Sequence, residues 1–168
     1  SPSYILPIQG LQRLEKLMDE YAGGITVNYM TNEPLLLRGL ALMKTFHEDL
    51  EYLGAEDLHQ LQRAWELKHR AIASECVIQH TLFRKETRWP GYYYRGDYLR
   101  LDDENWHALT LSHRDPESGD WTMEKAPVYH IVDCPLTRSK NGPKRARFFR
   151  ESSRSPLAQR SLTPQGLR

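Results

Sequence analysis

The sequence predicts a mainly α-helical fold, in which a spectrin-repeat-like three-helix bundle is followed by an aromatic loop, a β-hairpin and a disordered basic tail. Three observations support this fold class. Apolar residues recur at helical spacing between residues 7 and 84, and glycine or proline separates the runs. The pattern then changes to the alternation that is typical of strands. From residue 134 onward, proline, serine and arginine dominate and apolar residues are scattered.

The first two helices are expected to pack against each other. The first follows Pro7 and ends at the glycine pair 23–24, and its apolar stripe consists of Leu11, Leu14, Met18 and Tyr21. The second begins near Thr31, whose hydroxyl suits an N-cap, tolerates Pro34 in its first turn and ends before Gly54. Its apolar stripe consists of Leu36, Leu40, Met43, Leu50 and Leu53.

The third helix is expected from about Ala55 to Arg84, because this segment contains neither glycine nor proline. Its predicted buried stripe consists of Leu58, Leu61, Trp65, Ile72, Cys76 and Phe83. At about 1.5 Å per residue such a helix spans roughly 45 Å, which is longer than its two partners can cover. We therefore expect its far end, residues 79–84, to project toward another part of the protein.

A β-hairpin is expected after the helices. Residues 106–113 alternate in polarity, residues 114–120 are dense in turn formers, and residues 121–132 return to β-prone types. Pro127 is expected on an edge or at a bulge, because proline cannot donate to a ladder. Residues 99–106 are expected to form a loop or a short helical turn.

Charge divides the chain into an acidic body and a basic tail. Residues 134–168 carry nine Arg or Lys and one acid, a net charge of +8, whereas residues 1–133 carry 14 and 21, a net charge of −7. Such a tail buries too little apolar surface to offset its ordering entropy, so it is expected to be disordered. The expected organisation is a bundle with a docking loop (1–98), a loop and hairpin of the same domain (99–133), and the tail.

Several function classes are disfavoured by the composition. The tail has few interleaved aromatic residues on which bases could stack, which argues against nucleic-acid binding. A Gly-rich phosphate loop, a Cys-x-x-Cys pair and metal-ligand spacing among the histidines are all missing, so no catalytic residue and no metal site are predicted. The chain also lacks a secretory signal, an apolar run of about 18 residues and a disulfide framework, so a cytoplasmic protein without membrane contact is expected.

One segment carries a resemblance to a known family. "LFRKETRWPGYYYRGDYLRLDDENW", residues 82–106, resembles the R-x-E-x-R-G-x-H-x-R-x-D-Y segment and the following D-D-x-x-W element of the fumarate reductase and succinate dehydrogenase flavoprotein family. Where most members have glycine, alanine and histidine, residues 89–94 read "WPGYYY", a form similar to the adenylylsulfate reductase α subunits within this family. The matching positions are Arg84, Glu86, Arg88, Gly91, Tyr93, Arg95, Asp97, Tyr98, Asp102, Asp103 and Trp106.

The resemblance implies a C-terminal helical domain of an FAD-dependent oxidoreductase, most similar to one that interconverts adenosine 5′-phosphosulfate with sulfite and AMP. It further implies that FAD, the substrate-binding arginine and the catalytic histidine belong to upstream flavin-binding and capping domains, and that an iron–sulfur β subunit supplies the electrons. The chain is then expected to be a fragment that is inactive alone. A fumarate or succinate enzyme, and a free-standing helical adaptor that binds protein or nucleic acid, stay open as alternatives.

The candidate site is the charged and aromatic stretch that follows the third helix. Arginine forks pair bidentately with carboxylates, while tyrosine and tryptophan cover apolar area and keep a polar tip at the rim. Direct contact of Arg88 or Arg95 with a substrate phosphate is one alternative, and simple pairing of residues 84–88 at a frayed helix end is another. The residues expected to dock the helical domain against the flavin and capping domains, near the substrate entrance, are Arg84, Glu86, Arg88, Trp89, Tyr93, Arg95 and Asp97.

Overall fold

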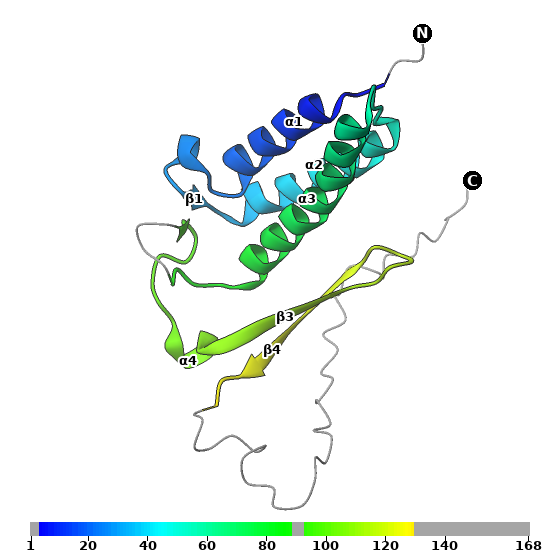
Figure 1. Cartoon of the computed structure of the whole chain (residues 1–168). Coiled ribbons are helices and arrows are strands. Elements are labelled where there is room, and N and C mark those ends of the chain that lie inside the picture. The colour runs from blue at the N-terminus through cyan, green and yellow to red at the C-terminus, as the bar shows by residue number, and fades with distance from the viewer. Residues whose placement is uncertain (1–3, 89–92, 130–168) are drawn as a thin grey trace, which may run out of the picture. The chain divides into compact units, whose positions relative to one another are not determined.

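The computed structural model describes residues 4–88 and 93–129 (Figure 1). The chain divides into two compact units, Ser1–Val128 and Tyr129–Arg168, and in the second unit only Tyr129 is described. The tail predicted to be disordered, residues 134–168, therefore lies outside the described residues. The helices and strands below all belong to the first unit.

Three long helices form the bundle, and a hairpin follows them, which confirms the predicted fold class (Figure 1). The helices are α1 (Pro7–Tyr21), α2 (Glu33–Asp49) and α3 (Leu58–Phe83), with 3-10 turns at Ile25–Val27 and Leu50–Tyr52. A short helix, α4 (Asp103–Trp106), precedes the antiparallel strands β3 (Ala108–Arg114) and β4 (Trp121–Pro127). Two further strands, β1 (Met30–Thr31) and β2 (Tyr94–Arg95), pair in parallel, and the sequence pattern did not predict them.

The start of α2 differs by one residue from the prediction. Asn32, rather than Thr31, is the N-cap, and its Oδ1 accepts a hydrogen bond from the Leu35 amide at 3.0 Å. The Thr31 hydroxyl instead donates to the Tyr21 carbonyl at 2.7 Å, and the Thr31 side chain is fully buried. Thr31 thus ties the end of α1 to the strand β1 and is not available as a cap.

The start of α3 also differs from the prediction. The helix begins at Leu58 rather than near Ala55, because Asp57 is its N-cap. The Asp57 carboxylate accepts a hydrogen bond from the Gln60 amide at 2.7 Å, and a negative charge at this end is favoured by the helix dipole.

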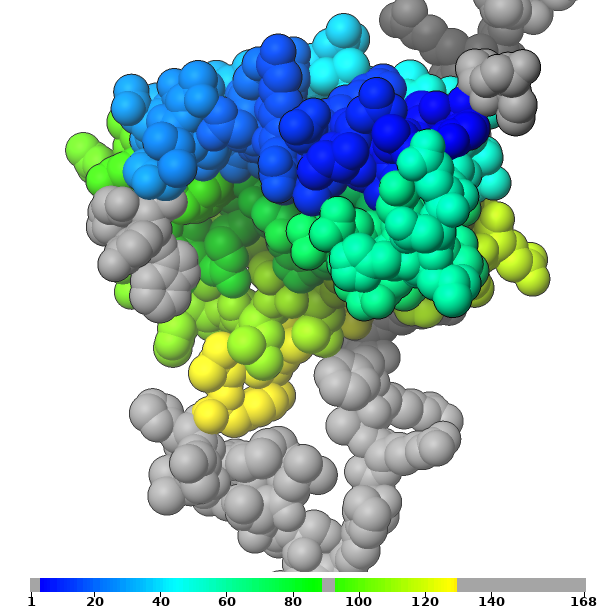
Figure 2. All heavy atoms as spheres, turned by 45° about the horizontal axis from the view of Figure 1, so that its top comes forward, coloured from blue at the N-terminus to red at the C-terminus, as the bar shows by residue number. Residues whose placement is uncertain are grey.

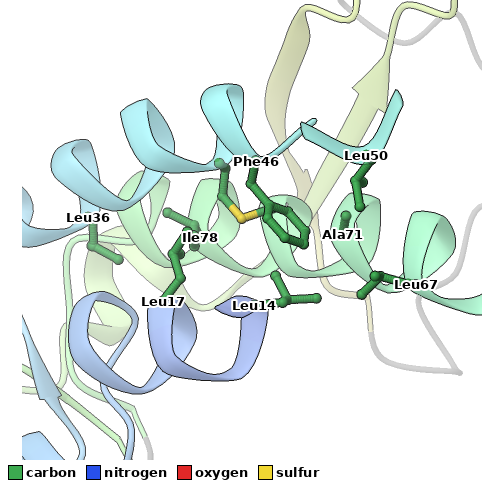
Figure 3. Packing of buried hydrophobic residues seen from close by; sticks show 9 residues of the cluster. Leu14, Leu17, Leu36, Phe46, Leu50, Leu67, Ala71 and Ile78 are labelled. Carbon is green, nitrogen blue, oxygen red and sulfur yellow. The ribbon is translucent and has the colours of Figure 1, made fainter. Parts of the chain in front are cut away.

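The core lies between the three helices (Figure 3). All of the residues predicted for the first two apolar stripes take part, either buried or packed against the core. α1 comes close to α3 at Gly10, where an added Cβ would lie 2.5 Å from Leu67 Cδ2. The buried apolar residues of this cluster are Leu14, Leu17, Leu36, Met43, Phe46, Leu50, Leu67, Ala71 and Ile78.

The predicted buried stripe of α3 is wrong over its N-terminal half. Leu58, Leu61, Trp65 and Ile72 are exposed by 84%, 45%, 60% and 37%. The side of α3 that faces the bundle carries Ala64, Leu67, Ala71 and Ile78. Small alanines let α3 approach its neighbours closely, whereas the periodicity of the larger apolar residues marks a second face of the helix. The remaining two predicted residues, Cys76 and Phe83, are half-buried.

The hairpin packs along the C-terminal half of α3 through polar side chains. His80 Nδ1 lies 3.0 Å from Thr110 Oγ1, and His80 Nε2 lies 2.9 Å from Ser112 Oγ. Leu109 and Leu111, which alternate with these residues on β3, are exposed on the opposite face. Within the described ranges, no helix combines the length and the apolar character that crossing a membrane requires.

Candidate functional site

The candidate stretch leaves the end of α3 and returns beside the start of α2 (Figure 1). α3 ends at Phe83, and the following residue already has extended backbone dihedrals. Further along, β2 pairs with β1, and the Tyr94 amide donates to the Tyr29 carbonyl at 2.8 Å. Trp89, one of the predicted site residues, lies outside the described residues.

Arg95 is fully buried, and its guanidinium caps the C-terminal end of α3. Nη1 donates to the carbonyls of Thr81, Leu82 (3.3 Å) and Arg84 (3.0 Å). Carbonyls at the C-terminal end of a helix lack N–H donors inside the helix, and a cation there also interacts favourably with the helix dipole. The guanidinium lies over the Tyr98 ring, 5.2 Å from its centroid.

Asp97 connects this cap to the start of α2. Its two carboxylate oxygens accept from Arg95 Nε and Nη2 at 2.9 and 2.8 Å, a bidentate pair. Asp97 Oδ2 also accepts from the amide of Glu33, the first residue of α2, at 2.9 Å. Burial acts to raise the pKa of Asp97, but the bonds from Arg95 and the Glu33 amide outweigh it, so the pKa is lowered. One ion pair thus joins the positive end of α2 to the negative end of α3.

Glu86 is the centre of a second cluster, and its side chain is fully buried. It accepts from Arg84 Nη1, from Arg88 Nε at 2.7 Å and Nη2 at 3.1 Å, and from the Asp102 amide at 3.0 Å. Burial acts to raise its pKa, but the bonds from Arg88, the Asp102 amide and Arg84 outweigh it, and the pKa of Glu86 is lowered. The carboxylate therefore stays ionised at neutral pH.

The two arginines of this cluster also bind the segment that begins the hairpin. Arg84 donates to the carbonyls of Trp106 and Ala108 at 3.0 and 2.9 Å. Arg88 Nη2 donates to Asp103 Oδ1 at 2.9 Å. Trp106 is buried, and its ring meets the Phe83 ring edge-on at 5.6 Å. The pairing of Arg84, Glu86 and Arg88 is therefore part of a partly buried network that attaches α4 and β3 to the end of α3.

Thr87 joins the two clusters, and sequence reasoning missed it. Its hydroxyl donates to the Tyr98 carbonyl at 2.7 Å and accepts from the Arg95 amide at 3.0 Å. Its own amide donates to the Arg100 carbonyl at 3.1 Å. A single threonine between charged residues carries no sequence signal for this role, because both partners of the hydroxyl are backbone groups.

The exposure of the site residues limits what they can contact. Arg84 and Arg88 keep 23% and 25% of their side chains exposed, whereas the Arg95 side chain is 0% exposed. Arg84 and Arg88 are thus partly accessible from outside the described bundle, whereas Arg95 is not. Tyr93 is half-buried, and burial raises the pKa of its hydroxyl. Across residues 4–88 and 93–129, no set of three or more His, Cys, Asp or Glu side chains is arranged to hold a metal ion.

Comparison with known proteins gives concordant results. A family model described as the fumarate reductase flavoprotein C-terminal region matches residues 11–140. The adenylylsulfate reductase α subunit of Megalodesulfovibrio gigas is 42% identical over 132 residues, which are 79% of this chain and 20% of that protein. The structure of adenylylsulfate reductase from Archaeoglobus fulgidus has a TM-score of 0.76 and 55% identity, and the match covers 79% of this chain and 21% of that one.

A more distant structure shows the same fold. The Sdh1 complex of Mycobacterium smegmatis has a TM-score of 0.59 and 18% identity, with 74% of this chain and 21% of that chain covered. The chain thus spans about one fifth of the length of the relatives it matches. The family model covers most of the chain, including the segment on which the resemblance was based. The chain belongs to the fumarate reductase flavoprotein C-terminal family.

Proposed function

We propose that this chain serves as the C-terminal helical domain of an FAD-dependent adenylylsulfate reductase, which interconverts adenosine 5′-phosphosulfate with sulfite and AMP. The main support for the proposal is that this chain shares far more of its sequence with one of two proteins that have the same fold in this region. Identity is 55% to adenylylsulfate reductase but 18% to the Sdh1 complex. The proposal includes an iron–sulfur β subunit as the source of electrons and a cytoplasmic location.

The described residues do not fit FAD. A dinucleotide pyrophosphate is held by free amides at a helix N-terminus and by a Gly-rich turn. At the start of α2 and of α3 these amides already bind the carboxylates of Asp97 and Asp57, whose charge would repel a phosphate. The first turn of α1 contains Pro7, which has no amide hydrogen. FAD is therefore assigned to the upstream flavin-binding domain.

The role proposed for this domain is support of the flavin and capping domains rather than chemistry. Glu86 and Asp97 are each held by arginine and stay ionised, so neither is placed to exchange a proton near neutral pH. Arg84 and Arg88 combine partial exposure with fixed orientation, which suits docking of a charged partner surface. Trp89 and Tyr93 are assigned to the same docking surface, and the pair of Arg95 and Asp97 holds it in place.

The experiment uses the complete flavoprotein with its iron–sulfur subunit. The preparation is assayed with adenylylsulfate and, separately, with succinate. We expect turnover with adenylylsulfate only, and turnover with succinate alone would contradict the proposal. Arg88→Ala is expected to lower the retained flavin and the turnover, because it leaves Glu86 and Asp103 without this partner. Arg13→Ala, which removes an exposed arginine of α1, is the matched control and should change neither quantity.

A further inference from the structure

The N-terminal half of α3 presents an apolar stripe that no described part of the chain covers. Leu58, Leu61, Trp65 and Ile72 follow one another at spacings of three, four and seven residues, which places them on one side of a helix. From Leu58 to Ile72 the stripe is about 21 Å long. Single exposed apolar residues are common on soluble proteins, but four of them on one side of one helix, interrupted only by Lys68 and His69, are typical of an interaction surface.

The stripe continues into a surface that is already an interface within the chain. Cys76, His80 and Phe83 lie on the same side of α3 and contact the hairpin segment. Cys76 Sγ is 3.7 Å from Ser112 Oγ, and the Phe83 ring meets the Trp106 ring at 5.6 Å. The hairpin therefore covers one half of a single helix face, and the stripe is the other half.

The position of the first described residues indicates which part of a complete subunit could cover the stripe. Tyr4 Oη donates to Glu56 Oε1 at 3.2 Å, and the Ile5 amide donates to the Tyr52 carbonyl at 2.8 Å. Figure 2 shows the beginning of α1, in dark blue, against the segment between α2 and α3, in blue-green. The chain therefore enters the bundle at the end where α3 begins. The relatives carry about four fifths of their length outside the matched C-terminal region.

We propose that Leu58, Leu61, Trp65 and Ile72 form a docking surface for an apolar face of the polypeptide that precedes residue 4 in the complete flavoprotein subunit. This inference rests on the proposed function. A covalently attached body that enters at this end of the bundle has a high effective concentration at the stripe, so it engages ahead of a free partner. The stripe has the composition of an interface core, because it combines the large aromatic Trp65 with leucine and isoleucine. The ion pair between Lys68 and Glu51 beside it supplies a polar rim.

The test measures the accessibility of one position on the stripe. Leu61→Cys is prepared in the 168-residue chain and in the complete flavoprotein subunit, and alkylation by iodoacetamide is followed at each cysteine by peptide mass spectrometry. Leu61 is already exposed in the described bundle, so the substitution leaves its core intact. Val77→Cys is the matched control, because Val77 is an exposed residue of α3 on a different side of the helix.

We expect Cys at position 61 to react about tenfold more slowly in the complete subunit than in the 168-residue chain, since reaction then requires local opening. Cys at position 77 should react at the same rate in both. The proposal would be overturned by equal rates at position 61 in the two preparations, or by equal protection of positions 61 and 77. It would also be overturned if position 61 became protected only after the iron–sulfur subunit was added, or only when the isolated chain was concentrated. If the complete subunit is active with adenylylsulfate but position 61 stays reactive, the docking surface is refuted and the proposed function is not. A protected position 61 without adenylylsulfate activity would refute only the proposed function.

Discussion

At the residue scale, the buried Arg95 is expected to contribute strongly to the free energy of unfolding, because its guanidinium binds both Asp97 and the end of α3. Arg95→Ala leaves the partly exposed Asp97 carboxylate without its bidentate partner and leaves three carbonyls at the end of α3 without this donor. The loss of unfolding free energy should exceed the roughly 1 kcal/mol of an exposed pair and stay below the loss of about 3–5 kcal/mol that is typical of a fully buried one, because the Asp97 side chain is 25% exposed. Arg95→Lys keeps the charge but loses the fork, so an intermediate loss is expected. Urea unfolding of the 168-residue chain, followed by circular dichroism, measures both losses.

The matched control for Arg95 is Arg13. Arg13 pairs with Asp49, and both side chains are partly exposed to water, so Arg13→Ala should change the unfolding free energy by no more than about 1 kcal/mol. Similar losses for Arg13→Ala and Arg95→Ala would show that burial does not decide the strength of these pairs.

The lowered pKa values of Glu86 and Asp97 predict a loss of stability in acid. Carboxyl groups in the unfolded chain titrate near pH 4, and these two titrate lower in the folded chain. Their contribution is complete above the unfolded pKa and is lost as the pH falls through the folded pKa. The free energy of unfolding should therefore fall below about pH 4. Glu86→Gln, measured by urea unfolding from pH 6 downward, should show a shallower fall than the wild type, and an unchanged slope would refute this assignment.

At the scale of elements, the sequence predicted the helices and the hairpin but not every face. The stripes predicted for the first two helices were right, because their large apolar residues lie on the side of each helix that faces the shared core. In α3 the same reasoning selected the face with Trp65, whereas the bundle is met by a face with Ala64 and Ala71. When a helix has two apolar faces, a prediction that assumes one buried stripe can select the wrong face. The size of the residues does not indicate which face packs against the bundle.

The residue types of the candidate site could be predicted from the sequence, but their partners could not. Arg95 lies far along the chain from Glu33, whose amide shares Asp97 with it. The pairing of β1 with β2 that brings these segments together involves only two residues of each strand. So short a ladder leaves no alternation for sequence reasoning to detect.

At the scale of the whole described unit, the bundle and the hairpin are held together by polar contacts. An isolated two-stranded hairpin is marginally stable in water. Here its start is fixed by Arg84, which binds the carbonyls of Trp106 and Ala108, and Glu86 orients that guanidinium. Its middle is fixed by His80. The hairpin should therefore owe its order to the Glu86 cluster rather than to an apolar core of its own.

Amide hydrogen exchange can test this dependence in the 168-residue chain. Glu86→Ala leaves two arginines without their buried carboxylate, so amides of β3 and β4 should lose about 2 kcal/mol or more of protection. Amides in the middle of α1, which packs away from this cluster, should lose less. Glu117→Ala, at the exposed hairpin turn, is the control and should leave both sets unchanged. If Glu86→Ala lowers protection in α1 and β3 equally, the hairpin and the bundle unfold as one cooperative unit, and the Glu86 cluster stabilises the whole rather than joining two parts.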